Sequence, residues 1–176
     1  IYFMKNLNYI FDNIEFVESK TPIPYKQALV TMENRVTLVK NNKENEMVWF
    51  LEHPSIYTSG SGNFIKESSI NNIPVYNTGR GGKITWHGPG QRIIYFIINI
   101  KKRKINIRSF VNDIENIVIK SLSKFNINAY KKEKVIGIWT KDVDKKDAKI
   151  SSLGFRVSKG VIYHGVSINI NCDLSN

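Results

Sequence analysis

The chain has a single cysteine, Cys172, among its 176 residues. One cysteine forms no internal disulfide, so the fold must rest on a hydrophobic core, and the protein is expected in a reducing compartment, the cytoplasm. Long apolar runs are missing too: Ile93–Ile100 is far shorter than the roughly 20 residues of a membrane-spanning helix, so no membrane partner is expected. The cysteine and three histidines show no metal-ligand spacing, which predicts no metal site.

Acidic residues are scarce: 15 Asp and Glu stand against 26 Lys and Arg, which gives a formal charge of +11. A lysine-rich surface on a chain rich in Asn, Ile and Lys explains this without any function. The functional alternatives are docking of an acidic protein or of nucleic acid. The basic clusters 101–104 and 131–134 lie in predicted connections without a recognised motif. A nucleic-acid-binding module therefore remains a rival interpretation, and nucleic acid is not the expected partner.

Hydrophobic spacing predicts two helices and several strands. The helices are expected over 25–40 and 109–125, the second capped by Ser109. Strands are expected near 47–52, 74–77, 92–100, 135–140, 148–157 and 161–171, and Lys159-Gly160 suits a hairpin turn between the last two. No repeat or linker divides the chain. The prediction is one α/β domain of the α+β type, with helices packed on a mixed sheet.

Residues 79–90 contain five glycines. Glycine allows positive φ and close approach of a ligand, and exposed N–H groups in such a loop bind a carbonyl oxygen or an anion. Arg80 and His87 lie near the ends of this loop and are expected to face one cavity. A tight connection between two strands is the alternative. The spacing fits neither a Walker loop nor a dinucleotide-binding fingerprint.

Lys149 lies in the strand predicted over 148–157. In a regular strand it shares a face with Ser151 and Leu153, and an amine on an apolar face is costly unless it is paired or functional. A side chain that extends from the strand end into water is the alternative.

His164 lies in the strand predicted over 161–171 and shares the apolar face of Val166 if the strand is regular. Taken alone, such a histidine is more typical of a satisfied core residue than of a functional one. His53 is expected to make a structural hydrogen bond.

The full loop pattern is more specific than its glycines. Residues 80–91 are R-G-G-K-I-T-W-H-G-P-G-Q. This segment resembles the signature R-G-G-x-x-T-(Tyr or Phe)-H-G-P-G-Q of the lipoyl(octanoyl) transferases and departs from it at Trp86. Further segments match the family in the same order over about nine tenths of the chain: Glu52-His53-Pro54, Tyr57-Thr58-Ser59-Gly60, Gly137-Ile138-Trp139, Lys149–Arg156 and Tyr163–Asn169.

The resemblance implies a fold, a reaction and partners. The fold is the mixed sheet of the biotin and lipoate protein ligase catalytic domains. The family transfers an octanoyl or lipoyl group through a cysteine thioester and uses no cofactor. The donor is octanoyl-acyl carrier protein, and the acceptor is a lysine of the lipoyl domains of 2-oxoacid dehydrogenases or of the glycine cleavage H protein.

The resemblance also implies the site residues. Lys149 is the catalytic lysine, because a nearby ammonium lowers the pKa of a thiol. His164 has a supporting role. The substrate-binding residues are Arg80, Gly81, Gly82, Lys83, Ile84, Thr85, Trp86, His87, Ser152, Leu153, Gly154, Gly165, Val166 and Ser167.

The nucleophilic cysteine of the family lies in a Pro-Cys-Gly segment, after a D-L-S-x-F stretch that residues 173–175 resemble. The nucleophile is therefore expected beyond Asn176. Residues 1–176 are expected to be one acyltransferase catalytic domain that misses its C-terminal segment and transfers no acyl group. Cys172 continues the alternation of Ile168 and Ile170 and is expected to be a small buried side chain.

An ATP-dependent lipoate or biotin protein ligase is the rival enzyme. Its related loop is similar to R-(Arg or Ser)-x-G-G-G-x-x-(Tyr or Phe)-H and lacks H-G-P-G-Q. Ligases activate the free acid as an adenylate, so adenylate formation separates the two. The acyl length is not set by these patterns.

Overall fold

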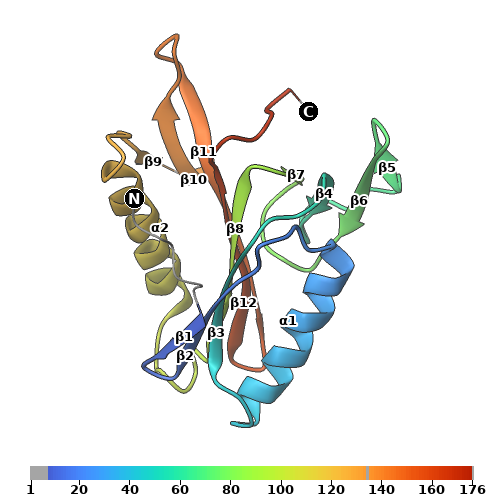
Figure 1. The fold of residues 1–176 in the computed structure, drawn as a ribbon, viewed down its shortest axis with the longest axis vertical. Helices are drawn as coiled ribbons and strands as arrows, with labels where there is room; N and C mark the ends of the chain where they lie inside the picture. Colours follow the sequence, from blue (N-terminus) through green and yellow to red (C-terminus); the bar gives the residue numbers. More distant parts are fainter. Residues whose placement is uncertain (1–7, 134, 176) are drawn as a thin grey trace.

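A computed structural model describes residues 8–133 and 135–175 and shows two β-sheets and two helices (Figure 1). The strands of the larger sheet are β1 (Asn8–Phe11), β2 (Ile14–Glu18), β3 (Glu46–Leu51), β8 (Gln91–Ile97), β9 (Tyr130–Lys132), β10 (Val135–Lys141), β11 (Asp147–Ser158) and β12 (Val161–Asn169). Those of the smaller sheet are β4 (Ile56–Ser59), β5 (Ser69–Ile70), β6 (Ile73–Asn77) and β7 (Thr85–His87). The spatial orders are β1-β2-β3-β8-β12-β11-β10-β9 and β5-β6-β4-β7.

Both sheets are mixed. In the larger sheet β2 and β3 run parallel, while their neighbours pair in antiparallel fashion. In the smaller sheet β4 is parallel to β6 and antiparallel to β7. A parallel pair needs a crossover connection, and helix α1 (Tyr25–Lys40) supplies it between β2 and β3. The predicted fold class, a mixed sheet with packed helices, is confirmed.

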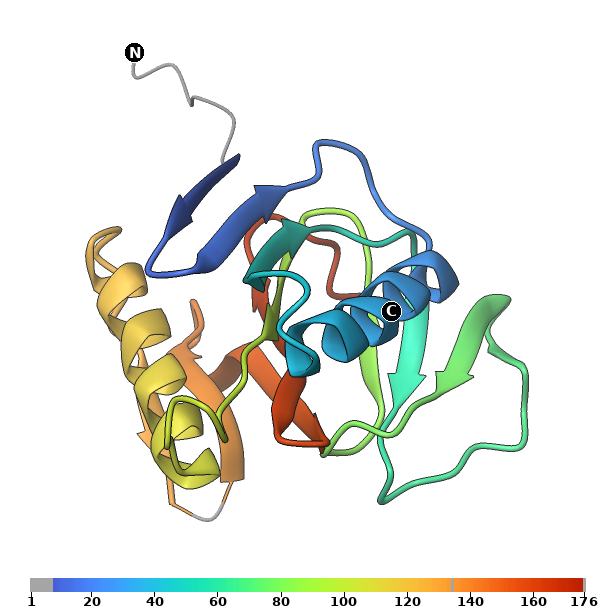
Figure 2. The same ribbon diagram turned by 90° about the horizontal axis from the view of Figure 1, so that it is seen from below.

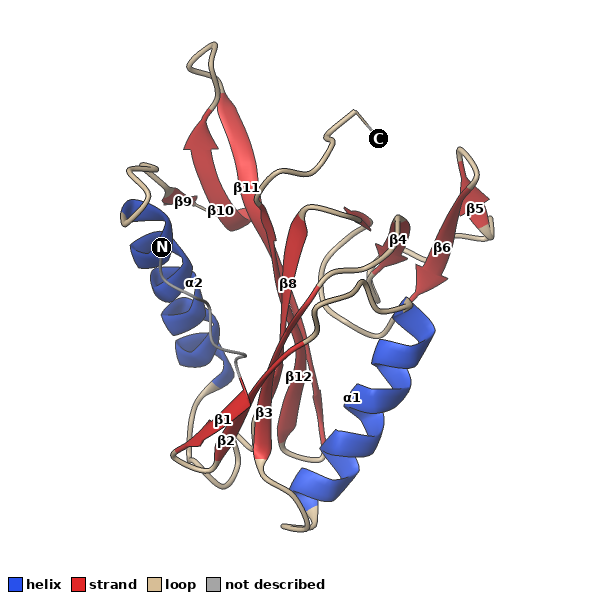
Figure 3. Cartoon of the chain, viewed as in Figure 1, coloured by secondary structure: helices blue, strands red, loops and turns tan. Residues whose placement is uncertain are grey.

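The two helices lie on opposite sides of the larger sheet (Figures 2 and 3). Helix α1 has the predicted bounds because its apolar residues recur at helical spacing. Its buried residues are Tyr25, Ala28, Met32, Val36 and Val39. They contribute to a cluster with residues of β3, β8 and β12. Each fully buried aliphatic side chain stabilises the fold by about 1.5–3 kcal/mol. No helix in the described part of the chain is both long and apolar enough to span a membrane.

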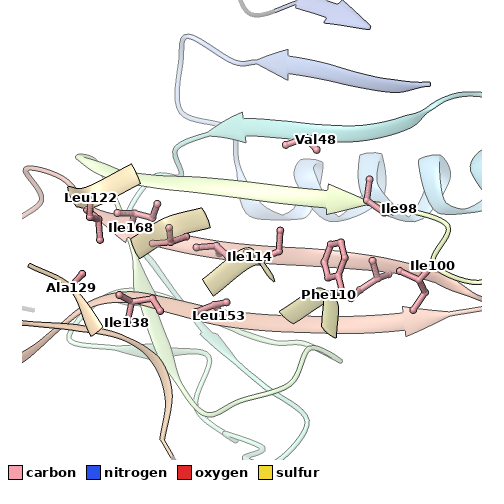
Figure 4. Close-up of a cluster of buried hydrophobic side chains, with 13 residues drawn as sticks. Val48, Ile98, Ile100, Phe110, Ile114, Leu122, Ala129, Ile138, Leu153 and Ile168 are labelled. Atoms are coloured by element: carbon pink, nitrogen blue, oxygen red, sulfur yellow. The ribbon is translucent and has the colours of Figure 1, made fainter. Parts of the chain in front are cut away.

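Helix α2 (Ile107–Ser123) covers the other face and starts before the predicted boundary. Its N-cap is Asn106, whose side chain accepts a hydrogen bond from the Arg108 backbone nitrogen at 2.8 Å. Ser109 therefore lies inside the first turn, and its prediction as the cap is wrong. Asn and Ser are equally good caps, so composition alone did not decide between them. The apolar stripe of α2 includes Phe110, Ile114 and Leu122 and packs against the second core cluster (Figure 4).

Tight hairpins join neighbouring strands. Lys159 and Gly160 turn between β11 and β12 with φ of 54° and 87°, as predicted. The β1–β2 hairpin was not predicted, although Asp12 and Asn13 adopt φ of 49° and 60° at its turn. Asp and Asn tolerate this left-handed region better than most residues, so the dipeptide was an available signal.

The middle of the larger sheet leaves no room for a side chain at one position of β12. Gly165 lies between Tyr95 of β8 and Gly154 of β11. A Cβ atom there would overlap with the carbonyl oxygen of Ile94. Close approach of the two strands therefore depends on this glycine.

Gly165→Ala is expected to destabilise the protein by about 3 kcal/mol, because backbone must move to admit the methyl group. Gly62→Ala is the matched control, since the nearest atom to its Cβ is the Gly82 carbonyl oxygen at 4.0 Å. Urea denaturation of the two variants measures the difference. Equal unfolding midpoints would show that β8 and β12 are not held this closely.

Candidate active site

A cavity of about 40 Å³ lies between the two sheets. Its lining comes from α1, from strands of both sheets and from the loop before β7. The lining residues are Tyr25, Thr58, Arg80, Thr85, His87, Ile93, Tyr95, Ser152, Leu153, Gly154, His164, Gly165, Val166 and Ser167. The three segments predicted to share a site, 80–87, 152–154 and 165–167, all reach this cavity.

The glycine loop lies directly on β11. The backbone nitrogen of Gly81 donates to the Phe155 carbonyl oxygen at 2.9 Å. A Cβ atom on Gly154 would lie 2.8 Å from the Gly81 carbonyl oxygen and 3.0 Å from Cδ of Arg80. The absence of a side chain at Gly154 thus lets the loop close over the strand and bring Arg80 to the cavity.

Five residues of the predicted set do not line the cavity: Gly81, Gly82, Lys83, Ile84 and Trp86. Lys83 and Ile84 are exposed. The indole nitrogen of Trp86 donates to Oγ of Ser55 at 2.9 Å, which anchors the aromatic position of the motif to the loop before β4. Substrate contact by these five residues stays a prediction.

Arg80 is buried, with 8% of its surface exposed. Its Nε and Nη2 donate to Oγ1 of Thr58 at 3.2 and 2.6 Å. Nη2 also donates to the Thr58 carbonyl oxygen at 2.8 Å. Nη1 donates to the Gly81 carbonyl oxygen at 2.9 Å. Burial lowers its pKa, although an arginine remains protonated at neutral pH. Among residues 8–133 and 135–175, no carboxylate forms an ion pair with Arg80.

A chain of hydrogen bonds leads from Thr58 across the strands. Nδ1 of His87 lies 2.7 Å from Oε1 of Gln91, an acceptor, so Nδ1 carries the hydrogen and Nε2 accepts from the Thr58 hydroxyl at 3.0 Å. Nε2 of Gln91 donates to Oδ1 of Asn169 at 2.9 Å, and Nδ2 of Asn169 donates to the Lys149 carbonyl oxygen at 3.4 Å. In each of these hydrogen bonds the donor is the residue nearer to Arg80 along the chain of bonds. Hydrogen bonds aligned in one direction polarise one another.

His87 is held neutral by this arrangement. Burial is the main cause that lowers its pKa to about 3, and the nearby Arg80 adds to it. Both ring nitrogens are occupied, by Thr58 and Gln91. His87 therefore orders the site and has no free nitrogen with which to take a proton.

His53 makes the structural hydrogen bonds that were predicted for it. The ring is fully buried, Nδ1 donates to the Ile23 carbonyl oxygen at 2.6 Å, and Nε2 lies 2.8 Å from the Tyr95 hydroxyl. Burial lowers its pKa to about 4. Because Nδ1 holds the hydrogen, Tyr95 donates to Nε2, and the pair ties the segment before α1 to β8.

His164 lies on the opposite face of β12 from the one predicted. Its φ is 63°, which interrupts the alternation of the strand. The ring stacks on Tyr163 at 4.7 Å and meets Tyr95 edge-on at 6.2 Å, on the α1 side, whereas Val166 packs on the α2 side. Nε2 of His164 is buried without a hydrogen-bond partner, and burial lowers the pKa of the ring to about 3.

Lys149 is exposed and does not line the cavity. A bulge explains why the predicted face is wrong: Ile138 pairs with Ser151 and Trp139 with Lys149, so Ile150 is an extra residue that breaks the alternation. The ammonium lies 5.3 Å from the centre of the Trp139 ring, and partial burial lowers its pKa.

Gly137 makes room for the Lys149 side chain. Its φ is 126°, and a Cβ atom there would lie 2.7 Å from Cε and 3.1 Å from Nζ of Lys149. Lys132 lies over the same indole at 4.1 Å but pairs with Asp147 at 2.6 Å. Lys149 has no such carboxylate partner among the ion pairs of the described residues.

Cys172 lies beyond the end of β12 and is half-buried, so its prediction as a core residue on a continuing strand is wrong. The backbone nitrogens of Ile170 and Asn171 donate to the Gly90 carbonyl oxygen, which draws the chain out of the sheet. Burial raises the pKa of the thiol, which disfavours a reactive thiolate. Within the described residues, no cluster of three or more His, Cys, Asp or Glu is arranged to hold a metal ion.

Several residues of the site were not predicted from the sequence. Tyr25, Ile93 and Tyr95 line the cavity, and Gln91 and Asn169 extend the hydrogen-bond chain. Thr58 belongs to the Tyr57–Gly60 segment, but nothing in that segment alone pairs it with Arg80. Gln91 could have been recognised as a residue of the site, because it ends the motif that contains His87.

The fold and the sequence are similar to those of known proteins. The family model described as "Lipoyl protein ligase A/B catalytic domain" matches residues 24–176. The bipartite lipoate protein ligase of Thermoplasma acidophilum superposes with a TM-score of 0.61 at 15% identity, over 92% of this chain and 62% of that one. The structure of lipoate-protein ligase A bound with ATP superposes with a TM-score of 0.62 at 16% identity, over 92% of this chain and 67% of that one. These two structures share the fold.

Curated relatives narrow the class. The octanoyltransferase of Ehrlichia chaffeensis is 42% identical over 168 residues, which cover 94% of this chain and 78% of that protein. The octanoyltransferase of Bradyrhizobium diazoefficiens is 37% identical over 166 residues, which cover 93% and 67%. The chain belongs to the octanoyltransferases of the lipoyl protein ligase A/B family.

Thr58→Val is expected to destabilise the protein by about 3 kcal/mol. Valine keeps the shape but leaves the Arg80 guanidinium and Nε2 of His87 without their shared partner, and the loss is largest for a buried charge. Thr58→Ser keeps the hydroxyl and should recover most of the loss. Urea denaturation compares the three proteins. If Thr58→Val unfolded at the same urea concentration as the unsubstituted protein, the Thr58 hydroxyl would not stabilise the site.

Stability is expected to fall as the pH drops from 6.5 to 5. The pKa values of His53, His87 and His164 are lowered to about 4, 3 and 3. The unfolded chain, with histidine pKa values near 6.5, therefore binds protons that the folded chain does not. Each histidine lowers the free energy of unfolding by about 1.6 kcal/mol over this interval. Urea denaturation at both pH values tests this.

His164→Asn provides the control for the pH experiment. Asparagine tolerates positive φ and does not titrate, so the variant should lose about one third less stability on acidification. An unchanged loss would mean that His164 is already free to protonate in the folded state.

Proposed function

We propose that this site holds a medium-chain acyl group, octanoyl or lipoyl, and transfers it to a lysine of a lipoyl domain. The observation that carries the proposal is the convergence of three segments, 80–87, 152–154 and 165–167, on one cavity. The octanoyltransferase relatives support acyl transfer in protein lipoylation. In this proposal acyl carrier protein is the donor, and residues 1–176 belong to one catalytic domain.

The transfer takes two steps in this proposal. A cysteine thiolate attacks the thioester carbonyl of the donor, a new carbon–sulfur bond forms, and the carrier thiol leaves. The amine of the acceptor lysine then attacks the enzyme thioester, the cysteine leaves as thiolate, and the amide remains.

Lys149 is the residue proposed to favour the thiolate. Its ammonium has no carboxylate that would neutralise it within the described chain, and partial burial lowers its pKa. It precedes Ser152 by three residues, or about 10 Å along a strand. An acyl chain that begins beside Lys149 and follows β11 reaches Ser152, Leu153 and Gly154, which line the cavity.

The positive charge of +11 supports docking of the two protein substrates. A basic rim attracts acidic partners and speeds their encounter. Acyl carrier protein and the lipoyl domains of 2-oxoacid dehydrogenases or the glycine cleavage H protein are the partners proposed.

The nucleophile is proposed to be a cysteine other than Cys172. Incubation of residues 1–176 with octanoyl-acyl carrier protein should give no adduct by intact mass. A chain extended through the Pro-Cys-Gly segment of the family should acquire one octanoyl group on that cysteine. An adduct on Cys172, lost in Cys172→Ser, would contradict the assignment.

In the extended protein, Lys149→Ala should slow adduct formation by several orders of magnitude at neutral pH while the fold is retained. Lys132→Ala is the matched control, because Lys132 contacts the same indole but is paired with Asp147. Equal slowing by both substitutions would assign the effect to the Trp139 region rather than to Lys149. Formation of octanoyl-adenylate from octanoate and ATP would instead support a ligase.

A further inference from the structure

The cavity carries a buried positive charge without a counter-ion. Arg80 lies in its wall, and none of the lining residues is Asp or Glu. His87 and His164 also line it and are neutral at pH 7, since burial lowers their pKa values to about 3. The net charge of the lining is therefore that of one guanidinium, and a buried charge without a partner is costly.

Two polar atoms of the lining lack hydrogen-bond partners. They are Oη of Tyr25 and Nε2 of His164, and these residues are 4% and 2% exposed. The hydroxyl of Thr78 lies near Tyr25, but it donates to the Ser59 carbonyl oxygen at 3.0 Å and makes no hydrogen bond with Oη of Tyr25. Buried polar atoms are rarely left unpaired, so both indicate a polar group that occupies the cavity.

The amino end of α1 adds to the positive potential. Tyr25 is the first residue of this helix, the preceding Pro24 offers no side-chain cap, and the first turn contains no acidic residue. The free backbone N–H groups and the helix dipole favour a negative charge at this end. Charge, unpaired polar atoms and the helix end thus point to the same ligand chemistry.

We propose that Arg80, Tyr25 and His164 form a subsite for the carboxylate of a free medium-chain fatty acid. The Nη1 of Arg80, which uses one of its two hydrogens on Gly81, and the hydroxyl of Tyr25 donate to the carboxylate oxygens. His164 donates from Nε2 in the tautomer that carries a hydrogen there.

The size of the cavity suits this group. A volume of about 40 Å³ accommodates about two or three water-sized atoms, which matches a carboxylate. A phosphate has more oxygen atoms than these three side chains can hydrogen-bond and more negative charge than one guanidinium can balance. The alkyl chain of the acid then leaves the enclosed volume past Ser152 and runs along β11 toward Lys149, over the path that the proposed function assigns to the acyl chain.

The inference rests on the proposed function, because it uses the same acyl cavity. It adds that the free acid competes with the acyl thioester for that cavity. The acyl thioester has its carbonyl beside Lys149 and brings no charge to Arg80. The free acid binds in the reverse direction, with its carboxylate at Arg80, so accumulated free acid inhibits transfer.

Isothermal titration calorimetry of residues 1–176 with sodium octanoate and with octanamide tests the proposal at pH 7. The two ligands share the alkyl chain and differ in charge. Octanoate should bind at least about 10-fold more tightly, a difference of about 1.4 kcal/mol. Tyr25→Phe removes only the unpartnered hydroxyl, so it should weaken octanoate about 5-fold, leave octanamide unchanged and preserve the fold. Tyr163→Phe, a buried tyrosine outside the cavity lining, is the control and should change neither.

The outcomes separate this proposal from the proposed function. Equal affinity for octanoate and octanamide would reject the carboxylate subsite and leave the acyl cavity in place. Binding of neither ligand would contradict the acyl cavity itself. Preference for octanoate that is undiminished in Tyr25→Phe would show that the charge is recognised elsewhere and would overturn the assignment.

Discussion

The hydrogen bonds between the Arg80 guanidinium and Thr58 are the contact on which the site depends. They compensate a buried charge with neutral acceptors, and such bonds are shorter and stronger than those between neutral groups. Because Thr58 belongs to β4, these bonds tie the loop before β7 to the smaller sheet. The Thr58 hydroxyl passes its own hydrogen to His87 of β7. Gln91 and Asn169 continue the connection into β8 and β12. The cavity walls from the two sheets are thereby held in one arrangement.

Much of the framework could be predicted because local chemistry determines it. The α1 helix follows from helical spacing of apolar residues after Pro24, and the β11–β12 turn follows from Lys159-Gly160. The convergence of the glycine loop with Gly154 and Gly165 followed from the family pattern, and the close backbone contacts explain why glycine stands at these positions. In each case the residues that decide the structure are neighbours in sequence or members of one specific motif.

The features that could not be predicted from the sequence depend on long-range geometry. The positive φ of His164 and the bulge at Ile150 each change which face of a strand a side chain occupies, and neither alters the hydrophobic pattern. Period-two alternation therefore placed His164 and Lys149 on the wrong faces. The hydrogen-bond partners of Arg80 and His87 come from three separate segments, β4, the glycine loop and β8, so no spacing rule within one segment could assemble them.

The position of β12 in the sheet has a consequence for synthesis of the protein. The last strand in the sequence lies between β8 and β11, near the middle of the larger sheet. Until residue 169 has left the ribosome, β8 presents an unpaired edge to the cell, and such edges are templates for aggregation. The two halves of the sheet, each largely made of antiparallel neighbours, join only when β12 is available. The cavity wall that β12 provides is therefore missing until this strand inserts, and Arg80 faces an incomplete site in the nascent chain.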